Sequence, residues 1–500
     1  MTVRTERDCF GREVRKSVRS GGMEKGAYRY QWGIANRLLS KENELTGTVT
    51  RYDYDRFDFL IRQETMQGSE TDVIYRVPDF VGNLFETPDK KDRKYGAGGK
   101  LLEDPDCFYH YDDEGNLIFR EFKQLQETGV KFDRKRIEKE RGIHFLATGT
   151  GWLYEWSSNG MLKKVIRPDG RPVEFRYDAL GRRTAKQYFG KVTRWIWDGN
   201  VPIHEWSYKV TDMQSDEKES TPSKEPIEDI TTWVFEAGTF VPTAKIQDGK
   251  QYSIVSDYLG TPIQMYDEQG NKTWNCTLDI YGKVRTFEGL SLNDCPFRFQ
   301  GQYEDEETGL YYNRFRFYDN LIGNYLSQDP IGLIGNNPTL YGYVRNLNQL
   351  VDPLGLETYF TRLGNFGEEK VMDALNRSGN YTHVFQVQNA ANQGIDIVAK
   401  TPDGHYDVFE VKTTRGSNVP SLYGEQLDPD EFVQTRLRTA GDNSEAFRLS
   451  KEKATDISMN IDKKYLIEVE VGTGTKGRWY VKNMKQKSWE KEAKKIGGHH

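Results

Sequence analysis

The feature of this sequence that most constrains its fold is a short unit that recurs along the chain. Clear copies read YHYDDEGNLI (109–118), FRYDALGRR (175–183) and YDEQGNKTW (266–274), and weaker copies occur at 279–285 and 51–55. Alternating aromatic and polar residues predict a strand, and the shared Asp-x-x-Gly element predicts the turn that follows it. Strand–turn–strand units in series predict an antiparallel sheet that extends by repetition and curls, because flat sheets of many strands are unusual.

The composition agrees with a large β structure. Aromatic residues make up 13% of the chain, with 29 Tyr, 25 Phe and 10 Trp, and aromatic pairs across strands contribute to sheet packing. The net charge of −6 indicates neither a nucleic-acid binder nor an acidic disordered protein. A length of 500 residues predicts two or three domains.

Several classes of protein are disfavoured by what the sequence lacks. No apolar run is long enough to span a bilayer, and the first residues, MTVRTERDCFGREVRK, have no apolar core of a signal peptide. The four cysteines are scattered and form no CxxC pair, and the seven histidines show no zinc-ligand spacing. We therefore expect synthesis in a reducing cytoplasm, no structural zinc, no membrane segment, and export that does not depend on a signal peptide.

The repeats resemble the YD repeats of Rhs and related polymorphic toxins, and residues 297–356 look like the Rhs repeat-associated core. The resemblance implies three parts: an all-β YD-repeat shell, or partial cage, at 1–296, the core at 297–356, and a variable toxin domain at 357–500. Two charged stretches, 119–141 and 208–230, are predicted to be solvated insertions in the shell.

Two Asp-Pro-x-Gly elements lie near the end of the core, at 329–332 and 352–355. In the Rhs family such elements bracket a self-cleavage site, so the resemblance implies hydrolysis after Leu356. Two facing carboxylates, Asp329 and Asp352, suit this chemistry because one holds a proton while the other activates water. The same residue types are also ordinary turn formers, since Asp-Pro begins turns and glycine completes them. The sequence leaves both interpretations open.

After the segment DPLGL (352–356), which we call the seam, the sequence predicts a compact α/β domain. An apolar stripe beginning at Leu363 predicts a helix that stops at Gly379, with acidic residues near its start. Residues 395–400 and 406–413, joined by Pro-Asp-Gly, predict a hairpin. In the second strand of the hairpin Glu410 and Lys412 share one face, because side chains alternate.

This hairpin carries two acidic residues and a lysine, the residue types that metal-assisted phosphodiester hydrolysis requires. Asp396 on the first strand approaches Glu410, and carboxylate oxygens are the ligands that Mg²⁺ prefers. A bound ion stabilises charge on phosphate and lowers the pKa of its water, which Lys412 is suited to orient or deprotonate. An acid-x-lysine on a strand is also an ordinary cross-strand ion pair.

The order GxxGEE (364–369), GID (394–396) and EVK (410–412) resembles the PD-(D/E)xK superfamily with its restriction-endonuclease-like fold. The family's proline before the aspartate is absent. The resemblance implies that Asp396 and Glu410 bind Mg²⁺ or Mn²⁺ and that Lys412 is the catalytic lysine.

The same resemblance makes Glu368 the helix acid near the metal, with Glu369 as the alternative, and Gln426 an auxiliary polar residue.

The end of the chain is basic. Residues 357–500 contain 21 basic and 21 acidic residues, but 476–495 has eight basic residues against two acidic ones, with three aromatics among them. Basic residues contact phosphates and aromatics stack on bases, so this tail is a candidate nucleic-acid surface. The residues expected on that surface are Arg436, Arg438, Lys482, Lys485 and Lys487. A packed strand followed by a solvated terminal helix explains the same residues.

The sequence therefore favours an Rhs-type antibacterial toxin with a Mg²⁺-dependent nuclease domain, acting on DNA or alternatively on RNA. A second interpretation is a structural or delivery protein whose last domain only binds a partner. A zinc deaminase is disfavoured because no HxE with a distal PCxxC occurs. The family resemblance further implies a cognate immunity protein, spike or adaptor proteins of a type VI secretion apparatus, and action in the target-cell cytoplasm.

Overall fold

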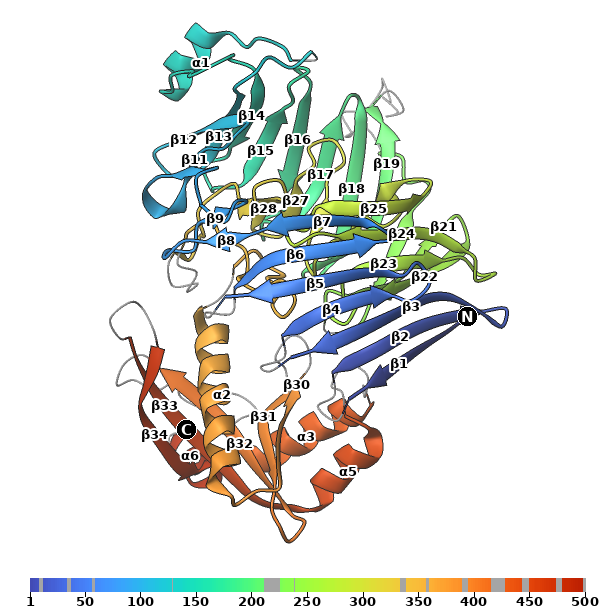
Figure 1. Cartoon of the computed structure of the whole chain (residues 1–500), viewed down its shortest axis with the longest axis vertical. Helices are drawn as coiled ribbons and strands as arrows, with labels where there is room; N and C mark the ends of the chain where they lie inside the picture. The colour runs from blue at the N-terminus through green and yellow to red at the C-terminus, as the bar shows by residue number, and fades with distance from the viewer. Residues whose placement is uncertain are drawn as a thin grey trace, which may run out of the picture. The chain divides into compact units, whose positions relative to one another are not determined.

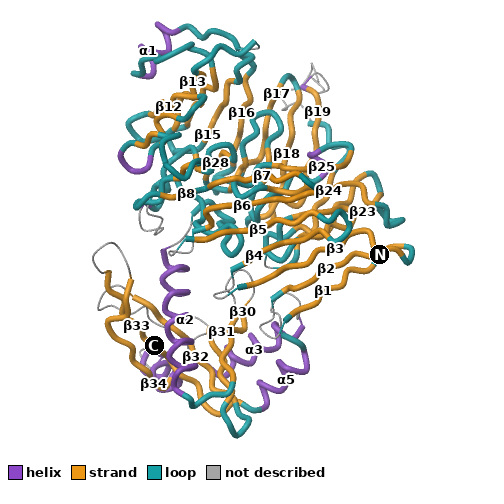
Figure 2. The backbone as a smooth tube through the Cα atoms, viewed as in Figure 1, coloured by secondary structure: helices purple, strands orange, loops and turns teal. Residues whose placement is uncertain are grey.

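The computed structural model describes the chain except residues 9–11, 34–36, 56–58, 128, 211–224, 238, 333–338, 357–358, 389–393, 415–427, 443–448, 474–478 and 498–500. It divides into two compact units, Met1–Glu357 and Thr358–His500. Strands dominate the secondary structure, as the repeats predict (Figure 2). Among the described residues, no helix is both long and apolar enough to cross a bilayer.

The first unit is built from two large antiparallel sheets in which each strand pairs with the next one along the chain (Figure 1). The seven-stranded sheet comprises β1 Thr2–Arg7, β2 Glu13–Ser20, β3 Met23–Trp32, β4 Leu38–Asn43, β5 Thr48–Tyr54, β6 Leu60–Gln67 and β7 Glu70–Tyr75. A short pair, β8 Val77–Pro78 and β9 Leu84–Phe85, follows it.

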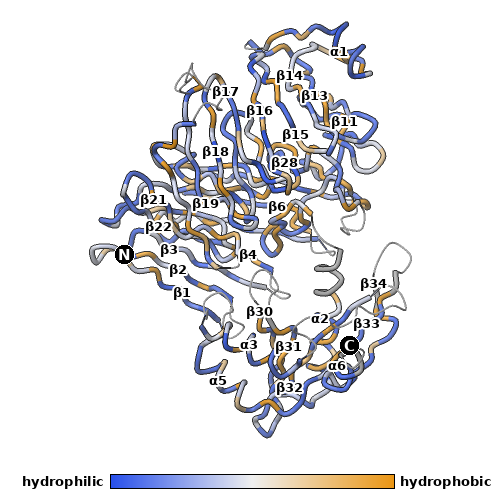
Figure 3. Tube along the Cα trace, turned by 180° about the vertical axis from the view of Figure 1, so that it is seen from behind, coloured by the Kyte–Doolittle hydropathy of each residue, from blue (hydrophilic) through white to orange (hydrophobic). Residues whose placement is uncertain are grey.

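The second sheet of this unit has sixteen strands in sequence order. They are β10 Lys94–Tyr95, β11 Leu101–Glu103, β12 Cys107–Tyr111, β13 Leu117–Phe122, β14 Gly151–Trp156, β15 Leu162–Ile166, β16 Pro172–Tyr177, β17 Arg183–Tyr188, β18 Lys191–Asp198, β19 Val201–Lys209, β20 Thr231–Phe235, β21 Pro242–Gln247, β22 Lys250–Ser256, β23 Pro262–Tyr266, β24 Lys272–Leu278 and β25 Val284–Gly289. Hydrophobic and hydrophilic residues are interspersed along these strands (Figure 3). The predicted antiparallel sheet that extends by repetition is confirmed.

The turns explain why the repeat is visible in the sequence. After β12, the Asp112 carboxylate accepts a hydrogen bond from the Asn116 backbone N–H at 2.7 Å, and the Gly115 N–H donates to the Asp112 carbonyl. Gly115 has φ +82°, a conformation that favours glycine. The turns at Asp178 and Asp267 repeat both interactions, so the aspartate and glycine are dictated by turn geometry.

The described residues of 297–356 pack inside the first unit. They form the small sheet of β26 Tyr303–Glu304, β27 Tyr311–Asn313, β28 Arg316–Asp319 and β29 Asn324–Tyr325, with turns around it. Tyr312 and Phe317 share a hydrophobic cluster with residues of β12–β16. Asp305 is fully buried, and Arg183 and Lys186 of β17 both form ion pairs with it. This segment therefore contributes much of the core on which the large sheet packs.

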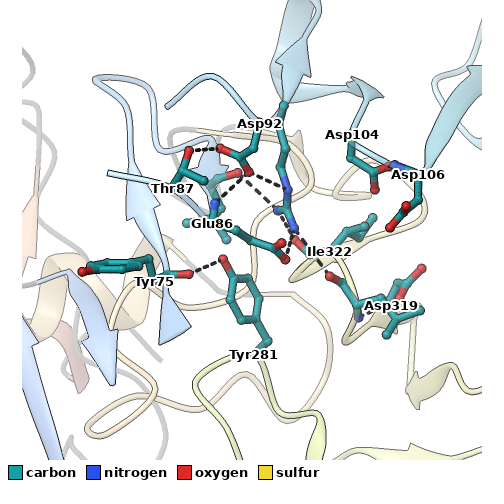
Figure 4. Close-up of polar contacts among 12 residues, drawn as sticks. Tyr75, Glu86, Thr87, Asp92, Asp104, Asp106, Tyr281, Asp319 and Ile322 are labelled. Carbon is teal, nitrogen blue, oxygen red and sulfur yellow. Dashed lines mark hydrogen bonds and ion pairs between the residues drawn. The ribbon is translucent and has the colours of Figure 1, made fainter. Parts of the chain in front are cut away.

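A buried arginine further ties this segment to the sheets. Arg93 donates to the carbonyls of Leu84 and Ile322 at 3.2 and 2.8 Å and forms an ion pair with Glu86 at 2.6 Å. Glu86 and Asp92 from one short segment and Ile322 from a distant one lie together around it (Figure 4). Backbone carbonyls and a carboxylate bind the two terminal nitrogens of the buried guanidinium, which stabilises the junction.

The predicted insertion at 119–141 begins later than expected. Residues up to Phe122 belong to β13, and Phe119 is fully buried, so the start of this charged stretch is a core strand. The insertion starts after β13 and contains helix α1, Arg134–Arg141, with Asp133 as its N-cap. In the other predicted insertion, 208–209 belong to β19 and 211–224 lie outside the described residues.

The second unit is a five-stranded sheet covered by helices on both faces. Its strands, in spatial order, are β30 His383–Gln388, β31 Gly394–Lys400, β32 Tyr406–Thr414, β33 Ile461–Thr473 and β34 Trp479–Ser488. Only β32 and β33 are parallel among the described pairs. The helices are α2 Tyr359–Ser378, α3 Pro429–Asp442, α5 Lys451–Met459 and α6 Trp489–Gly497.

Two hydrophobic clusters define the faces of this sheet. Val371 of α2 packs with Phe409 and Val411, whereas Val433 of α3 packs with Val408, in a cluster that also includes residues of α5 and α6. The helix predicted to stop at Gly379 ends at Ser378, and the predicted hairpin corresponds to β31 and β32.

Candidate active sites

The candidate site of the second unit forms where the pairing of β31 with β32 ends. This antiparallel pairing stops at Ile397, and against β30 the register of β31 shifts between Ile395 and Val398. Such a bulge redirects a side chain and often lies beside an active site. Just past the end of the ladder, Asp396 Oδ2 accepts a hydrogen bond from the Val411 backbone N–H at 2.7 Å. The aspartate side chain thus takes the place of a backbone partner.

Glu410 and Lys412 lie beside Asp396 on β32. Lys412 Nζ is 2.9 Å from Glu410 Oε1, and the two side chains are 13% and 5% exposed respectively. Burial raises the pKa of Glu410, while the positive charges of Lys412 and then Arg436 oppose that rise. Arg436 reaches this site from α3, where its guanidinium also lies 5.0 Å from the Phe432 ring centroid.

Glu368 comes from α2, which packs on the face of the sheet opposite to α3. A Cβ at Gly367 would lie 1.9 Å from Thr413 Oγ1, so this glycine permits α2 to approach β32 closely. Glu368 is 7% exposed and accepts a hydrogen bond from Gln386 Nε2 of β30 at 2.7 Å. Glu369 is 63% exposed and forms an ion pair with the next residue, so the geometry favours Glu368 as the helix acid.

The charges of this site suit a cation. Burial raises the pKa of Asp396 well above its ordinary value, and the negative charges of Glu410 and Glu368 raise it further. Among the described residues, no three histidine, cysteine or acidic side chains are placed so as to enclose a metal ion. Mg²⁺ does not need such a cage, because it keeps several waters and takes one or two protein carboxylates. The donor set of Asp396 and Glu410 therefore fits Mg²⁺.

The expected nucleic-acid surface is dispersed over several elements. Lys482, Lys485 and Lys487 lie on β34, where Lys487 and Lys482 form ion pairs with glutamates of β33 at 2.5 and 3.4 Å. Lys485 is exposed, as is Arg438 on α3. Arg436 instead lies near the carboxylates. The tail comprises a paired strand and the terminal helix α6, and the predicted auxiliary residue Gln426 is outside the described residues.

A second candidate site lies in the first unit, at the seam. Arg316 Nη2 is 3.1 Å from Asp329 Oδ2 and 3.6 Å from Asp352 Oδ2, so one guanidinium holds both carboxylates. Arg316 Nε also donates to the Gly355 carbonyl, and Asp352 Oδ1 accepts from the Leu356 N–H at 2.9 Å. Burial raises the pKa of both aspartates, and Arg316 opposes the rise. The structure thus brings the two predicted aspartates together next to Leu356.

Sequence reasoning missed four residues at the two sites. Arg316, Tyr325 and Asn313 surround Asp352, and Gln386 holds Glu368. No local pattern in the sequence indicates them, because each contacts Asp352 or Glu368 across at least eighteen positions of the chain.

The sequence matches one family model and is similar to several known toxins. The family model described as teneurin YD-shell matches residues 83–340. Double-stranded DNA deaminase toxin A of Burkholderia cenocepacia is 30% identical over 383 residues, covering 71% of this chain and 24% of that protein. Probable deoxyribonuclease RhsB of Dickeya dadantii is 31% identical, covering 52% of this chain and 16% of that protein. Toxin protein Tse5 of Pseudomonas aeruginosa is 33% identical, covering 72% and 31%.

Among solved structures, the crystal structure of TcdB2–TccC3 matches with 20% identity and a TM-score of 0.33, covering 71% of this chain and 21% of that one. The chain spans less than a third of the length of each of the three curated relatives. The YD-shell match covers more than half of the 500 residues and coincides with the repeated strand–turn units of the first unit. This chain belongs to the Rhs/teneurin YD-shell family.

Proposed function

We propose that this chain is an Rhs-type antibacterial toxin whose second unit hydrolyses phosphodiester bonds of nucleic acid, with DNA as substrate and Mg²⁺ or Mn²⁺ as cofactor. The observation that carries the proposal is the meeting of Asp396, Glu410 and Lys412 where the β31–β32 pairing ends, with the negative charge of Glu368 acting on Asp396. Buried acids crowded beside a lysine are costly for folding alone, which favours a functional role. The site is that of a PD-(D/E)xK nuclease with a restriction-endonuclease-like fold.

Each residue has a distinct role in this proposal. Asp396 and Glu410 would hold the metal ion, which would stabilise phosphate charge and lower the pKa of a bound water. Lys412, held by Glu410 at 2.9 Å, supplies a positive charge that binds a phosphate oxygen or orients the attacking water. Glu368, fixed by Gln386, adds a carboxylate suited to accept a proton from that water.

DNA is the favoured substrate because relatives of this family are named a deoxyribonuclease and a double-stranded DNA deaminase toxin. RNA is the alternative, since phosphodiester chemistry is common to both. A cell that makes such a toxin in its cytoplasm needs an immunity protein that covers the site. Delivery into a target cell would use spike or adaptor proteins of a secretion apparatus.

The test is a cleavage assay with the full chain. We expect Mg²⁺-dependent degradation of plasmid DNA by the parent, and a loss of roughly 100-fold or more in Lys412→Ala and Asp396→Asn. Glu369→Gln, which changes an exposed acid next to Glu368, is the matched control and should keep full activity. Total RNA run in parallel decides the substrate. Unchanged cleavage by Lys412→Ala and Asp396→Asn refutes the site.

A parent chain that cleaves neither nucleic acid favours the competing function, a delivery protein whose second unit only binds a partner.

The proposal includes self-cleavage after Leu356. Water adds to the Leu356 carbonyl carbon, one of its protons passes to one aspartate of the Asp329–Asp352 pair, and the other aspartate protonates the leaving amine as the C–N bond breaks. The supporting observation is the shared contact of both carboxylates with Arg316, next to the Leu356 N–H. Mass spectrometry of the purified chain should show a break after Leu356 that Asp352→Asn and Asp329→Asn abolish. An intact parent, or cleavage in both variants, contradicts this part of the proposal.

A further inference from the structure

The carboxylate of Asp352 is oriented by a chain of hydrogen bonds with a defined direction. Tyr325 O–H donates to Asp352 Oδ2 at 2.9 Å, and Asn313 Nδ2 donates to the Tyr325 oxygen at 2.5 Å. The same Asn313 nitrogen donates to the backbone carbonyl of Asp352 at 2.7 Å. All three residues are buried.

The backbone carbonyl fixes the direction of this chain. A carbonyl oxygen only accepts, so the amide nitrogen of Asn313, and not its oxygen, must face Asp352. That nitrogen then occupies the acceptor side of the Tyr325 hydroxyl, which leaves the hydroxyl proton for Asp352. Burial, and then the negative charge of Asp352, raise the pKa of Tyr325 well above its ordinary value, so the phenol remains a donor.

Both oxygens of Asp352 are therefore committed. Oδ2 faces Tyr325, and Oδ1 faces the backbone N–H of Leu356 at 2.9 Å. The guanidinium of Arg316 lies over the Tyr325 ring, 3.7 Å from its centroid, which restricts the tyrosine from the other side. Rotation of the carboxylate would break one of the two hydrogen bonds.

We propose that Tyr325 is a positioning residue for self-cleavage, whose hydroxyl, directed by Asn313, holds the Asp352 carboxylate against the segment that is cut. The inference rests on the proposed self-cleavage. Tyr325 contacts Asp352 and acts on the cleaved bond through it. Neither the Asp-Pro-x-Gly motif nor the spacing of the two aspartates contains it.

The groups that face Asp352 determine what a test should measure. They are Arg316 of β28, Asp329, the Tyr325 hydroxyl of β29 and the Tyr343 hydroxyl, which accepts from the Asp352 N–H at 3.3 Å. Removal of the Tyr325 hydroxyl takes away a donor that favours ionised Asp352. The limb of the pH–rate profile that belongs to Asp352 should then move to higher pH by roughly one unit.

The experiment follows cleavage of the full chain with time after pulse-labelled cell-free synthesis, in buffers that span about two pH units. Tyr325→Phe should slow cleavage roughly 10-fold or more and shift one limb of the profile upward. Tyr318→Phe is the matched control, because its ring lies 5.8 Å from that of Tyr325 and its hydroxyl donates to the Tyr281 carbonyl. The control loses one buried hydrogen bond and should keep the parental profile.

A second variant covers the case in which Tyr325→Phe does not fold. Replacement of Tyr325 by 3-fluorotyrosine keeps the ring and makes the hydroxyl a stronger donor, so the same limb should move to lower pH. Parental rates and profiles in both Tyr325 variants overturn the inference while self-cleavage stands. Equal slowing in Tyr318→Phe also overturns it, because the effect is then structural. A parent chain that stays intact, with or without Asp352→Asn, overturns self-cleavage itself and this inference with it.

Discussion

Glu121 offers a direct test of how the insertion after β13 is held. Its side chain is fully buried, and its two oxygens accept hydrogen bonds from the backbone N–H groups of Leu146, Ala147 and Gly149 at 2.7, 2.8 and 2.9 Å. His110 Nε2 lies 3.1 Å away. Burial alone would raise the pKa of Glu121, but His110 and the three N–H groups outweigh it and lower the pKa to about 2. We predict that Glu121→Gln loosens residues 146–149, which lie at the end of the insertion just before β14.

The expected loss follows from the pKa. A fall from 4.5 to about 2 corresponds to an upper limit of roughly 3 kcal/mol in favour of the ionised, folded form. The variant also turns an NH₂ group toward backbone donors, so we expect a loss of about 2–3 kcal/mol. Because the folded pKa is depressed, this stability is fully present above pH 4.5 and disappears as the pH falls toward 2. The difference between parent and variant should shrink over that range.

Hydrogen exchange of the amides at 146, 147 and 149, together with limited proteolysis of 123–150, measures the opening of this segment. The matched control is Glu174→Gln, since Glu174 is 43% exposed and pairs with Lys164 at 2.7 Å. A surface pair of this kind contributes less than about 1 kcal/mol. Equal protection in Glu121→Gln and the parent, or an equal loss in both variants, refutes the reasoning.

Two further predictions concern the seam and the basic tail. Gly355 has φ +68°, and a Cβ there would lie 2.5 Å from the Asn313 carbonyl oxygen. Gly355→Ala should therefore distort the seam and stop self-cleavage, as measured by mass spectrometry. Gly309→Ala is the control, because Gly309 has φ +70° and a Cβ there would meet no atom within 4 Å. Lys485 is exposed, whereas Lys487 is paired with a glutamate at 2.5 Å. Lys485→Gln should therefore reduce the slope of log binding constant against log salt concentration for DNA by about one, and Lys487→Gln should reduce that slope by less. Equal slopes for both lysine variants in a binding titration contradict the second prediction.

The parts of the fold that could be predicted from sequence are those in which a residue type is dictated locally. Asp112 and Gly115 are required by their own turn, and the Gly379 position ends its own helix, so short patterns reveal them. The sequence does not reveal strand β13, because Glu121 resembles a surface charge and the backbone N–H groups that bind it lie twenty-five or more residues further along. The strand alternation identified Glu410 and Lys412 as neighbours, since two residues on one strand face need no tertiary information.

Other features depend on contacts that no local pattern records. The bulge that directs Asp396 arises from a register shift against β30, and the period-two rule assumes no such shift. Arg316 reaches Asp352 across thirty-six positions of chain, through a fold in which 297–356 packs as core. For these residues the sequence indicates which functional groups are present, and only the tertiary structure shows which of them lie close together.

The strand order of the first unit has a consequence for how this protein folds. In the sixteen-stranded sheet every strand pairs with its neighbour in sequence, so most of its hairpins are able to form from local contacts as they emerge during synthesis. The core contacts of 297–356 are different, since Arg183 must wait for Asp305 and Arg76 must wait for Val344, 122 and 268 residues later. The sheet of this unit should therefore fold quickly, and the docking of 297–356 should be a slow final step. The final segment to dock is the one that contains both aspartates of the seam.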